Sequence, residues 1–256
     1  MRTSFYIALL TAAVACAAPP LRFCLDPNNL PFSNDRGEGF ENQIAELVAG
    51  ELRRPVESVW WAQRRGFVRN ALTAGLCDVV PGIPTSMDSL MATRAYYRSS
   101  YVFVSRSSIG PRSFDDPMLR RLRIGVQIVG DDYANTPPAH ALSKRGIVNV
   151  HGYRVAGNYN EPNAPARIID AVASGEIDLA IAWGPMAGYF ARRQPIRLYV
   201  SPVAVAPGES QIPLSYDIGM GVRKRDFELK RAVDEALERS RDRITKILRE
   251  FNVPHQ

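Results

Sequence analysis

The side chains that most often perform catalysis are few and scattered in this sequence. The three histidines, His140, His151 and His255, do not fall at the His-x-x-x-His or Glu-x-x-His spacings that place two metal ligands on one helix face. No Gly-x-Ser-x-Gly turn exposes a nucleophilic serine, and no Cys-x-x-Cys-His motif binds haem. The sequence therefore predicts no metal site, no catalytic nucleophile and no cofactor.

Polar and aromatic side chains instead gather after the first predicted strand, a pattern typical of a binding site. Asp26, Asn28, Asn29 and Phe32 lie in a loop whose prolines exclude helix and whose Asn and Asp side chains favour turns. Ligands of open α/β sheets bind in loops at the carboxyl ends of the strands. We expect these side chains to line a cleft, with the satisfaction of backbone groups inside turns as an equal alternative for the polar ones.

A second candidate loop holds Gln63, Arg64 and Arg65 between the second predicted strand and the next helix. The amino end of that helix would favour an anion beside the two arginines. Adjacent arginines in a loop are also commonly solvated, and that alternative is the stronger one.

Two further candidate groups flank a predicted junction between two parts of the chain. Tyr96, Tyr97 and Arg98 open a long hydrophobic segment, where tyrosine and arginine could wall a cleft, anchor a partner, or pack beneath the segment. Trp183 ends a buried strand, from which it could stack on a planar ligand or fill the cleft. We expect Trp183 to line the cleft rather than to lie in the core.

The elements that would position these side chains alternate regularly along the chain. Strands are predicted at residues 22–25, 55–61 and 76–83, with helices at 40–48 and 64–74. This order predicts a parallel sheet with right-handed crossovers. A second unit repeats the architecture without repeating the sequence, with strands at 122–127, 147–153, 177–183 and 197–205 and a helix at 162–174.

The junctions predict two lobes joined by a hinge. The segment 96–105 leaves the first unit, and the strand 218–223 returns to it before two amphipathic helices end the chain. Two crossovers, near 101–105 and 215–221, would place a cleft between the lobes. We assign residues 19–103 and 218–256 to the first lobe and residues 104–217 to the second.

Residues 1–18 have the pattern of a secretory signal peptide. One arginine precedes an apolar run from Phe5 to Val14, and small residues follow this run, which is too short to span a bilayer. Ala13 stands three residues before Cys16, where a lipobox has leucine, so a lipid anchor at Cys16 is not expected. We expect an exported chain with no transmembrane segment after cleavage.

Two cysteines remain after this cleavage, Cys24 and Cys77, and both lie on predicted strands of the same region. An even pair of cysteines in an exported protein predicts a disulfide. Two reduced core thiols are the alternative, because the sequence does not give the distance that a disulfide requires.

The formal net charge of +6 restricts the possible partners. Basic residues gather at 120–123, 192–197 and 223–225. An exported chain without a nucleic-acid-binding motif is not expected to bind nucleic acid. Solvated faces and attraction to an acidic partner are the two remaining interpretations.

Three segments carry a resemblance to a known family. They are CLDPNNLPFSN at residues 24–34, WWAQRRGFVRNALTAGLCDVVPGIP at 60–84 and TRAYYRSSYVF at 93–103. From residue 21 to 253 the chain resembles the type II periplasmic solute-binding proteins, and within them the MoxJ and XoxJ type encoded with periplasmic quinoprotein alcohol dehydrogenases. The resemblance implies two α/β lobes, each a mainly parallel sheet flanked by helices, with two hinge crossovers.

The same resemblance implies a non-enzymatic accessory in the periplasm. Its partner would be a dehydrogenase that depends on pyrroloquinoline quinone and oxidises methanol or another alcohol, with the c-type cytochrome of that enzyme as a further candidate. The accessory would bind the dehydrogenase and assist its maturation or activation. Any quinone would belong to the partner.

Two departures separate the chain from the amino-acid receptors of this fold. The span 86–91, Ser-Met-Asp-Ser-Leu-Met, lacks the arginine that clamps the substrate carboxylate in those receptors, and Trp183 replaces their aspartate for the amino group. Each lost contact is worth about 1.5 to 3 kcal/mol, which argues against an amino-acid ligand. A receptor that delivers a small ligand of another kind to an ABC permease is the first alternative. A dehydratase-like enzyme using Glu38 and Arg64 is the second.

Overall fold

The computed structural model describes residues 18–129, 135–154, 161–204 and 213–253. The expected signal peptide, except for its last residue, and His255 lie outside these residues. The longer helices are α1 (Phe40–Glu51), α2 (Pro137–Lys144), α3 (Arg167–Ser174), α4 (Gly184–Ala191), α5 (Phe227–Arg239) and α6 (Arg241–Glu250). Short helical turns span Val68–Thr73 (η1, a π-helix), Pro117–Arg121 (η2) and Ala164–Ala166 (η3).

Most of the strands belong to one path of pairing that runs through both lobes, and two form a separate hairpin. They are β1 (Leu21–Leu25), β2 (Asn28–Asn29), β3 (Ser33–Asn34), β4 (Val56–Trp60), β5 (Val79–Pro84), β6 (Met91–Ala92), β7 (Tyr97–Ser105), β8 (Ile124–Ile128), β9 (Val150–Arg154), β10 (Leu179–Trp183), β11 (Tyr199–Pro202) and β12 (Ser215–Val222). Their order is β4-β1-β5-β12-β7-β10-β8-β9, with β11 beside β7, β6 beside β12, and a separate β2-β3 hairpin.

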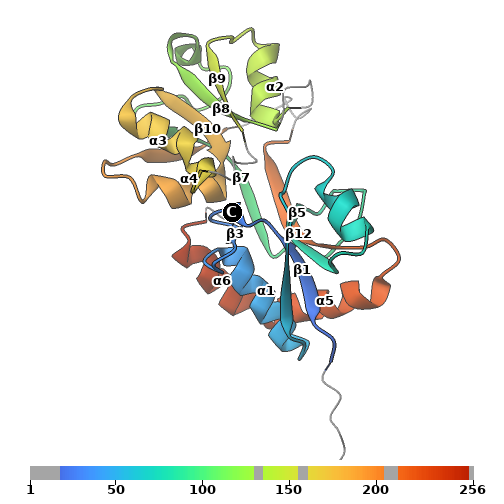
Figure 1. The fold of residues 1–256 in the computed structure, drawn as a ribbon. Coiled ribbons are helices and arrows are strands. Elements are labelled where there is room, and N and C mark those ends of the chain that lie inside the picture. The colour runs from blue at the N-terminus through green and yellow to red at the C-terminus, as the bar shows by residue number, and fades with distance from the viewer. Residues whose placement is uncertain (1–17, 130–134, 155–160, 205–212, 254–256) are drawn as a thin grey trace, which may run out of the picture.

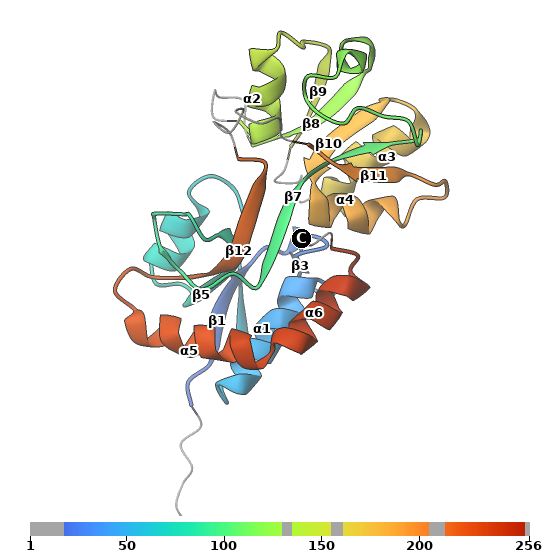
Figure 2. The ribbon, with the colours of Figure 1, turned by 180° about the vertical axis from the view of Figure 1, so that it is seen from behind.

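The pairing confirms the predicted two-lobed α/β fold. In the first lobe β1 pairs in parallel with β4 and β5, and in the second β8 pairs in parallel with β9 and β10. The antiparallel strands β7 and β12 are the two crossovers between the lobes (Figure 1). Helices α1, α5 and α6 cover one lobe, whereas α2, α3 and α4 belong to the other (Figures 1 and 2). The residue limits assigned to the lobes stay a prediction.

An ion-paired aspartate ties three strands together in the first lobe. Asp78 Oδ1 lies 2.8 Å from Arg22 Nη2 and 3.0 Å from Arg223 Nη2, and Asp78 Oδ2 accepts the backbone N–H of Arg22 at 3.2 Å. Burial opposes ionisation, yet the hydrogen bonds from Arg22 and Arg223 lower the pKa of Asp78 to about 2. The carboxylate therefore joins β1 and β12 to the start of β5.

The second lobe contains an equivalent ion-paired aspartate. Asp178 Oδ1 lies 2.7 Å from Arg123 Nη2, and hydrogen bonds from Arg123 lower the pKa of Asp178 to about 2. In each lobe a glycine with positive φ, Gly75 or Gly175, stands three residues before the aspartate and ends the preceding helix. The lobes thus share a short Gly-x-x-Asp motif although most of their sequence differs.

Two helices that the sequence did not predict begin with proline in their first turn. Pro137 opens α2, and Pro185 is the second residue of α4. Proline indicates a loop in most contexts but is tolerated in the first turn, where its missing N–H has no helical partner. Another difference is that the predicted helix at 64–74 is a π-helix that begins at Val68.

The predicted disulfide between Cys24 and Cys77 is confirmed. Both residues are fully buried, and their Cα atoms lie 5.5 Å apart, within the range that disulfides require. The bond links β1 to the segment that enters β5. It therefore fixes the strand that precedes the first candidate loop.

The largest apolar core extends across both lobes. The Phe251 ring, in the chain after α6, lies 5.8 Å from the Phe40 ring of α1 and 5.8 Å from the Tyr189 ring of α4. The Phe251 and Tyr189 planes differ by only 13°, so the two rings are stacked. The C-terminal segment therefore packs between the lobes, and we call this contact region the lobe seam.

Candidate functional site

Asp26 organises the loops at the carboxyl ends of β1 and β4. Its Oδ1 atom accepts the Asn28 N–H at 2.9 Å, and its Oδ2 atom accepts the Gln63 N–H at 2.7 Å. Asn29 Nδ2 donates to Gln63 Oε1 at 3.1 Å. Asp26 is only 2% exposed, so its carboxylate serves these backbone groups. The structure thus brings the two candidate loops together.

Asn28 connects this loop to the other lobe. Its Nδ2 atom donates to the carbonyl oxygen of Glu161 at 2.9 Å, across a sequence separation of 133 residues. The nearby Phe32 ring is half-buried and packs edge-on against Phe40 at 5.4 Å. The first loop therefore contacts the second lobe with a polar side chain and the core of its own lobe with an aromatic one.

The charged candidates of the second loop lie on the surface. Arg64 and Arg65 are exposed, next to the half-buried Gln63. Glu38, considered for a dehydratase, forms an ion pair with Arg36 at 2.8 Å and accepts from Asn34 Nδ2 at 2.7 Å. Its carboxylate is thus engaged locally. The described residues contain no group of three or more His, Cys, Asp or Glu side chains that could hold a metal ion.

Trp183 lies in an aromatic cluster at the two crossover strands. Its ring centroid is 5.3 Å from that of Tyr101 on β7 and 5.9 Å from that of Tyr216 on β12, both at edge-to-face angles. The backbone N–H of Trp183 donates to Gln127 Oε1 at 2.8 Å, which fixes the end of β10 against β8. The indole is half-buried, so it packs against the hinge and keeps part of its surface accessible.

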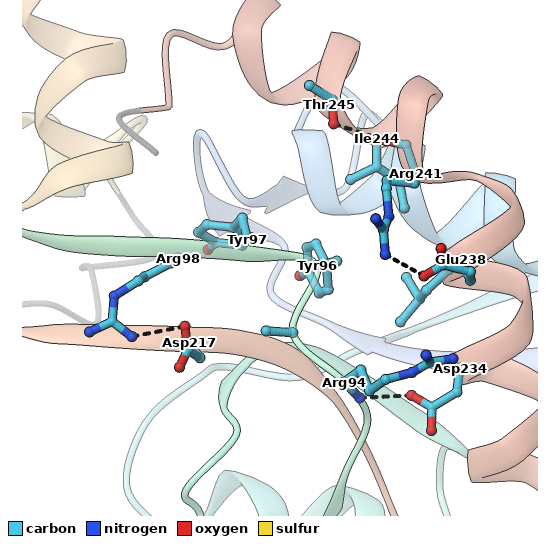
Figure 3. Close-up of a pocket in the computed structure, with 12 residues that line it drawn as sticks. Arg94, Tyr96, Tyr97, Arg98, Asp217, Asp234, Glu238, Arg241, Ile244 and Thr245 are labelled. Atoms are coloured by element: carbon cyan, nitrogen blue, oxygen red, sulfur yellow. Dashed lines mark hydrogen bonds and ion pairs between the residues drawn. The ribbon is translucent and has the colours of Figure 1, made fainter. Parts of the chain in front are cut away.

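Tyr96, Tyr97 and Arg98 line a pocket between the crossover strands and the C-terminal helices, separate from the loops of Asp26 and Gln63. This pocket has a volume of about 360 Å³ and is shown in Figure 3. Arg98 pairs with Asp217 at 2.9 Å, and Arg98 Nη2 also donates to the Ser215 hydroxyl at 2.8 Å. Both contacts join β7 to β12.

The charges of this pocket compensate one another. Arg241 pairs with Glu238 at 2.6 Å, and the backbone N–H of Arg94 donates to Asp234 Oδ1 at 2.7 Å (Figure 3). Lys230 also pairs with Asp234, at 2.6 Å. Because cations and carboxylates neutralise each other around the pocket, its lining presents no strong preference for an anion or a cation.

Sequence analysis missed a buried carboxyl group, Glu41, in the first turn of α1. Glu41 is 1% exposed, and its Oε2 atom has no hydrogen-bond partner in the described structure. Burial, with repulsion from Asp26, raises the pKa of Glu41 to about 8. The signal was present, because Glu41 precedes the buried Ala45 and Val48 by four and seven residues and therefore lies on the inner face of α1.

The predicted side chains thus form three groups. Asp26, Asn28, Asn29 and Gln63 form a hydrogen-bonded loop cluster, Trp183 belongs to the hinge cluster, and Tyr96, Tyr97 and Arg98 line the pocket behind the crossovers. No arrangement of a nucleophile with a base is found among these three groups. Their role in binding a ligand or partner stays a prediction.

Comparison with known proteins places this fold in a family. No protein-family model matches the chain. The protein MoxJ of Methylorubrum extorquens is 31% identical over 257 residues, which cover 95% of this chain and 85% of MoxJ. The chain belongs to the MoxJ family. A second MoxJ, from Paracoccus denitrificans, is 31% identical over 265 residues, covering 95% of this chain and 94% of that protein.

A solved structure supports the MoxJ assignment. The crystal structure of the periplasmic binding protein XoxJ from Methylobacterium extorquens AM1 is 35% identical, with a TM-score of 0.75. The match covers 92% of this chain and 99% of XoxJ. These comparisons confirm the resemblance to the MoxJ and XoxJ type and its binding-protein fold. None of the helices in the described part of this MoxJ-family protein has the length and apolar character needed to cross a membrane.

Proposed function

We propose that this MoxJ-family protein is a non-catalytic periplasmic accessory of methanol oxidation. It binds a methanol or alcohol dehydrogenase that depends on pyrroloquinoline quinone and assists the maturation or activation of that enzyme. The c-type cytochrome of the dehydrogenase is a further candidate partner. Support comes from the relatives, of which two are MoxJ proteins and one is the periplasmic binding protein XoxJ.

The observation that carries the proposal is the lobe seam. Phe251 stacks on Tyr189 across it, and Asn252 Nδ2 donates to the Gly188 carbonyl oxygen at 3.2 Å. The Asn28 side chain donates to Glu161 of the opposite lobe. These contacts join the lobes directly. A body with joined lobes offers a constant surface to a protein partner, whereas a transport receptor of this fold opens and closes around its solute.

The hinge cluster supports the same proposal. Trp183 occupies the position where amino-acid receptors place an acid, and its ring packs on Tyr101 and Tyr216. An aromatic surface therefore stands where an amino-acid receptor would have a charged anchor. A charged solute would lose the charge-assisted hydrogen bonds that hold it in such receptors.

A binding assay with the purified dehydrogenase tests the proposal directly. The mature chain is immobilised, and the apo and holo forms of the dehydrogenase are passed over it by biolayer interferometry. We expect a saturable complex with at least one form. In parallel, cells lacking this chain should yield dehydrogenase with a lower specific activity, restored when the gene is supplied again.

The absence of a complex together with unchanged dehydrogenase activity would contradict the proposal. A thermal-shift screen of small alcohols, acids and aromatic solutes separates the solute-receptor alternative, because a ligand that binds only the folded state raises the melting temperature. Turnover of a dehydratase substrate would instead support the enzyme alternative.

A further inference from the structure

A groove with basic and apolar side chains lies at the lobe seam. It is formed by the end of α4, the segment 192–198 and the start of β11, together with Asn252 from the chain after α6. Figure 2 shows α4, β11 and the C-terminal end of the described chain close together. The groove has a volume of about 470 Å³, which lies within the range of ligand sites. A segment bound there would contact both lobes.

The lining of the groove carries positively charged side chains and no negatively charged ones. Arg192 and Arg197 are exposed on its lining, and no lining residue is acidic. Neither guanidinium has an acidic partner among the residues that the structure describes, although Arg197 Cζ lies 5.0 Å from the Tyr199 ring centroid. Asp170, which contacts a lining residue, accepts a hydrogen bond from Gln194 Nε2 at 2.7 Å. Two cations without carboxylates attract a negatively charged partner.

The pocket behind the crossovers differs from the groove in its charge. There Arg98 has Asp217 as its partner and Arg241 has Glu238, so the positive charge is largely neutralised within the protein. In the groove at the seam, the positive charge is available to another molecule. The groove is therefore the better candidate for binding an anion.

Apolar side chains are exposed beside these cations. Ile196 is 42% exposed and Val200 is 38% exposed, and both line the groove. Val200 belongs to β11, which pairs with β7 and with no other strand in the described part of the sheet. Arginine beside accessible apolar side chains is a common composition of protein interfaces. A small free anion would use the two arginines but leave the apolar side chains in water.

We propose that this groove binds an acidic segment of the dehydrogenase that also carries an apolar side chain. Carboxylates of that segment lie against Arg192 and Arg197, and its apolar side chain covers Ile196 and Val200. The inference rests on the proposed function, because it names the surface and the chemistry by which the accessory recognises its partner. It also gives the basic cluster at 192–197 a role in attracting that partner.

Charge reversal of the two arginines tests the groove. The double variant Arg192→Glu/Arg197→Glu should bind the dehydrogenase about tenfold more weakly or worse, since two exposed charge pairs are lost and both new carboxylates repel the acidic segment. Its binding should also depend less on salt, because fewer charge pairs remain to be screened. The control Arg112→Glu/Arg121→Glu makes the same charge change on exposed residues of the second lobe outside the groove, and it should retain affinity.

A synthetic peptide of alternating glutamate and leucine serves as a second probe, measured by fluorescence anisotropy on the same variants. Equal dehydrogenase binding by the groove variant and the wild type would overturn the inference while leaving the proposed function intact. Groove-dependent binding of the peptide without any binding of the dehydrogenase would support the chemistry of the groove and remove the proposed partner. Failure of both probes would overturn the inference, and together with unchanged dehydrogenase activity in cells lacking this chain it would overturn the proposed function as well. Circular dichroism checks that each variant is folded.

Discussion

Replacing Glu41 by glutamine should change how the stability of this protein depends on pH. The carboxyl group is buried, Oε2 has no hydrogen-bond partner in the described structure, and Asp26 repels the ionised form. Nearby, Gly82 has no side chain, and a Cβ atom built there would lie 2.0 Å from Glu41 Oε1. The carboxyl group therefore fills a closely packed space that leaves no room for a charge-stabilising neighbour at Gly82.

The size and sign of the effect follow from the raised pKa. The pKa of Glu41 is about 8 in the folded protein against an ordinary 4.5. Below pH 4.5 the carboxyl group is neutral in both the folded and the unfolded chain, so its full contribution to the free energy of unfolding is present. As pH rises through the interval, the unfolded chain releases the proton and the folded chain retains it. The free energy of unfolding should fall by about 5 kcal/mol in total, at about 1.4 kcal/mol for each pH unit.

Urea denaturation followed by tryptophan fluorescence measures this difference. The free energy of unfolding of Glu41→Gln, minus that of the wild type, should grow by several kcal/mol between pH of about 5 and about 8. The control Glu46→Gln removes an exposed carboxyl group from the same helix and should leave the pH profile of the wild type unchanged. A difference that stays constant with pH, or an equal effect of both variants, would refute the reasoning.

Four further perturbations test the elements around the site. Replacing Cys24 and Cys77 by serine should lower the unfolding free energy by about 4 kcal/mol, because the bond closes a loop with a sequence separation of 53 residues; chemical denaturation under oxidising conditions measures the loss. Asp78→Asn should cost about 2 kcal/mol at neutral pH. This cost should shrink as pH falls below the ordinary value of 3.8 toward the folded pKa of about 2, where the wild type loses its own ion pairs, as thermal unfolding at several pH values would show. Phe251→Ala should cost about 3 to 5 kcal/mol and increase hydrogen exchange on both sides of the seam. Trp183→Ala should cost about 2 kcal/mol and remove the near-ultraviolet circular dichroism of the hinge cluster.

The sequence predicted the elements whose apolar spacing is regular. The first strand and the helix with Phe40, Ile44 and Val48 on one face were placed to within a few residues, because burial of one face leaves a local pattern. Trp183 was placed correctly at the end of its strand for the same reason. Helix α4 was missed because its Gly-Pro start has the composition of a turn.

The contacts between the lobes could not be predicted from local patterns. Tyr101 and Tyr216 contact Trp183 only because β7 pairs with β10 on one side and with β12 on the other. The stack of Phe251 on Tyr189 joins residues from the chain end and from α4. The sequence around either residue does not predict this contact. Burial of Glu41 could be inferred from its helical spacing, whereas the lack of a partner for Oε2 depends on the packing of several elements.

The lobe seam gives an energetic reason to prefer a partner-binding accessory to a transport receptor. Opening the lobes separates Phe251 from either Phe40 or Tyr189, because one of these rings belongs to each lobe. Separating such an aromatic pair forfeits about 0.5 to 1.5 kcal/mol beyond the apolar area that it exposes, which disfavours an opened arrangement. A solute entering between the lobes would have to offset that loss. The groove beside the seam is accessible without any opening of the lobes, so a protein partner that binds there would avoid this loss and would bear only the cost of ordering the exposed side chains.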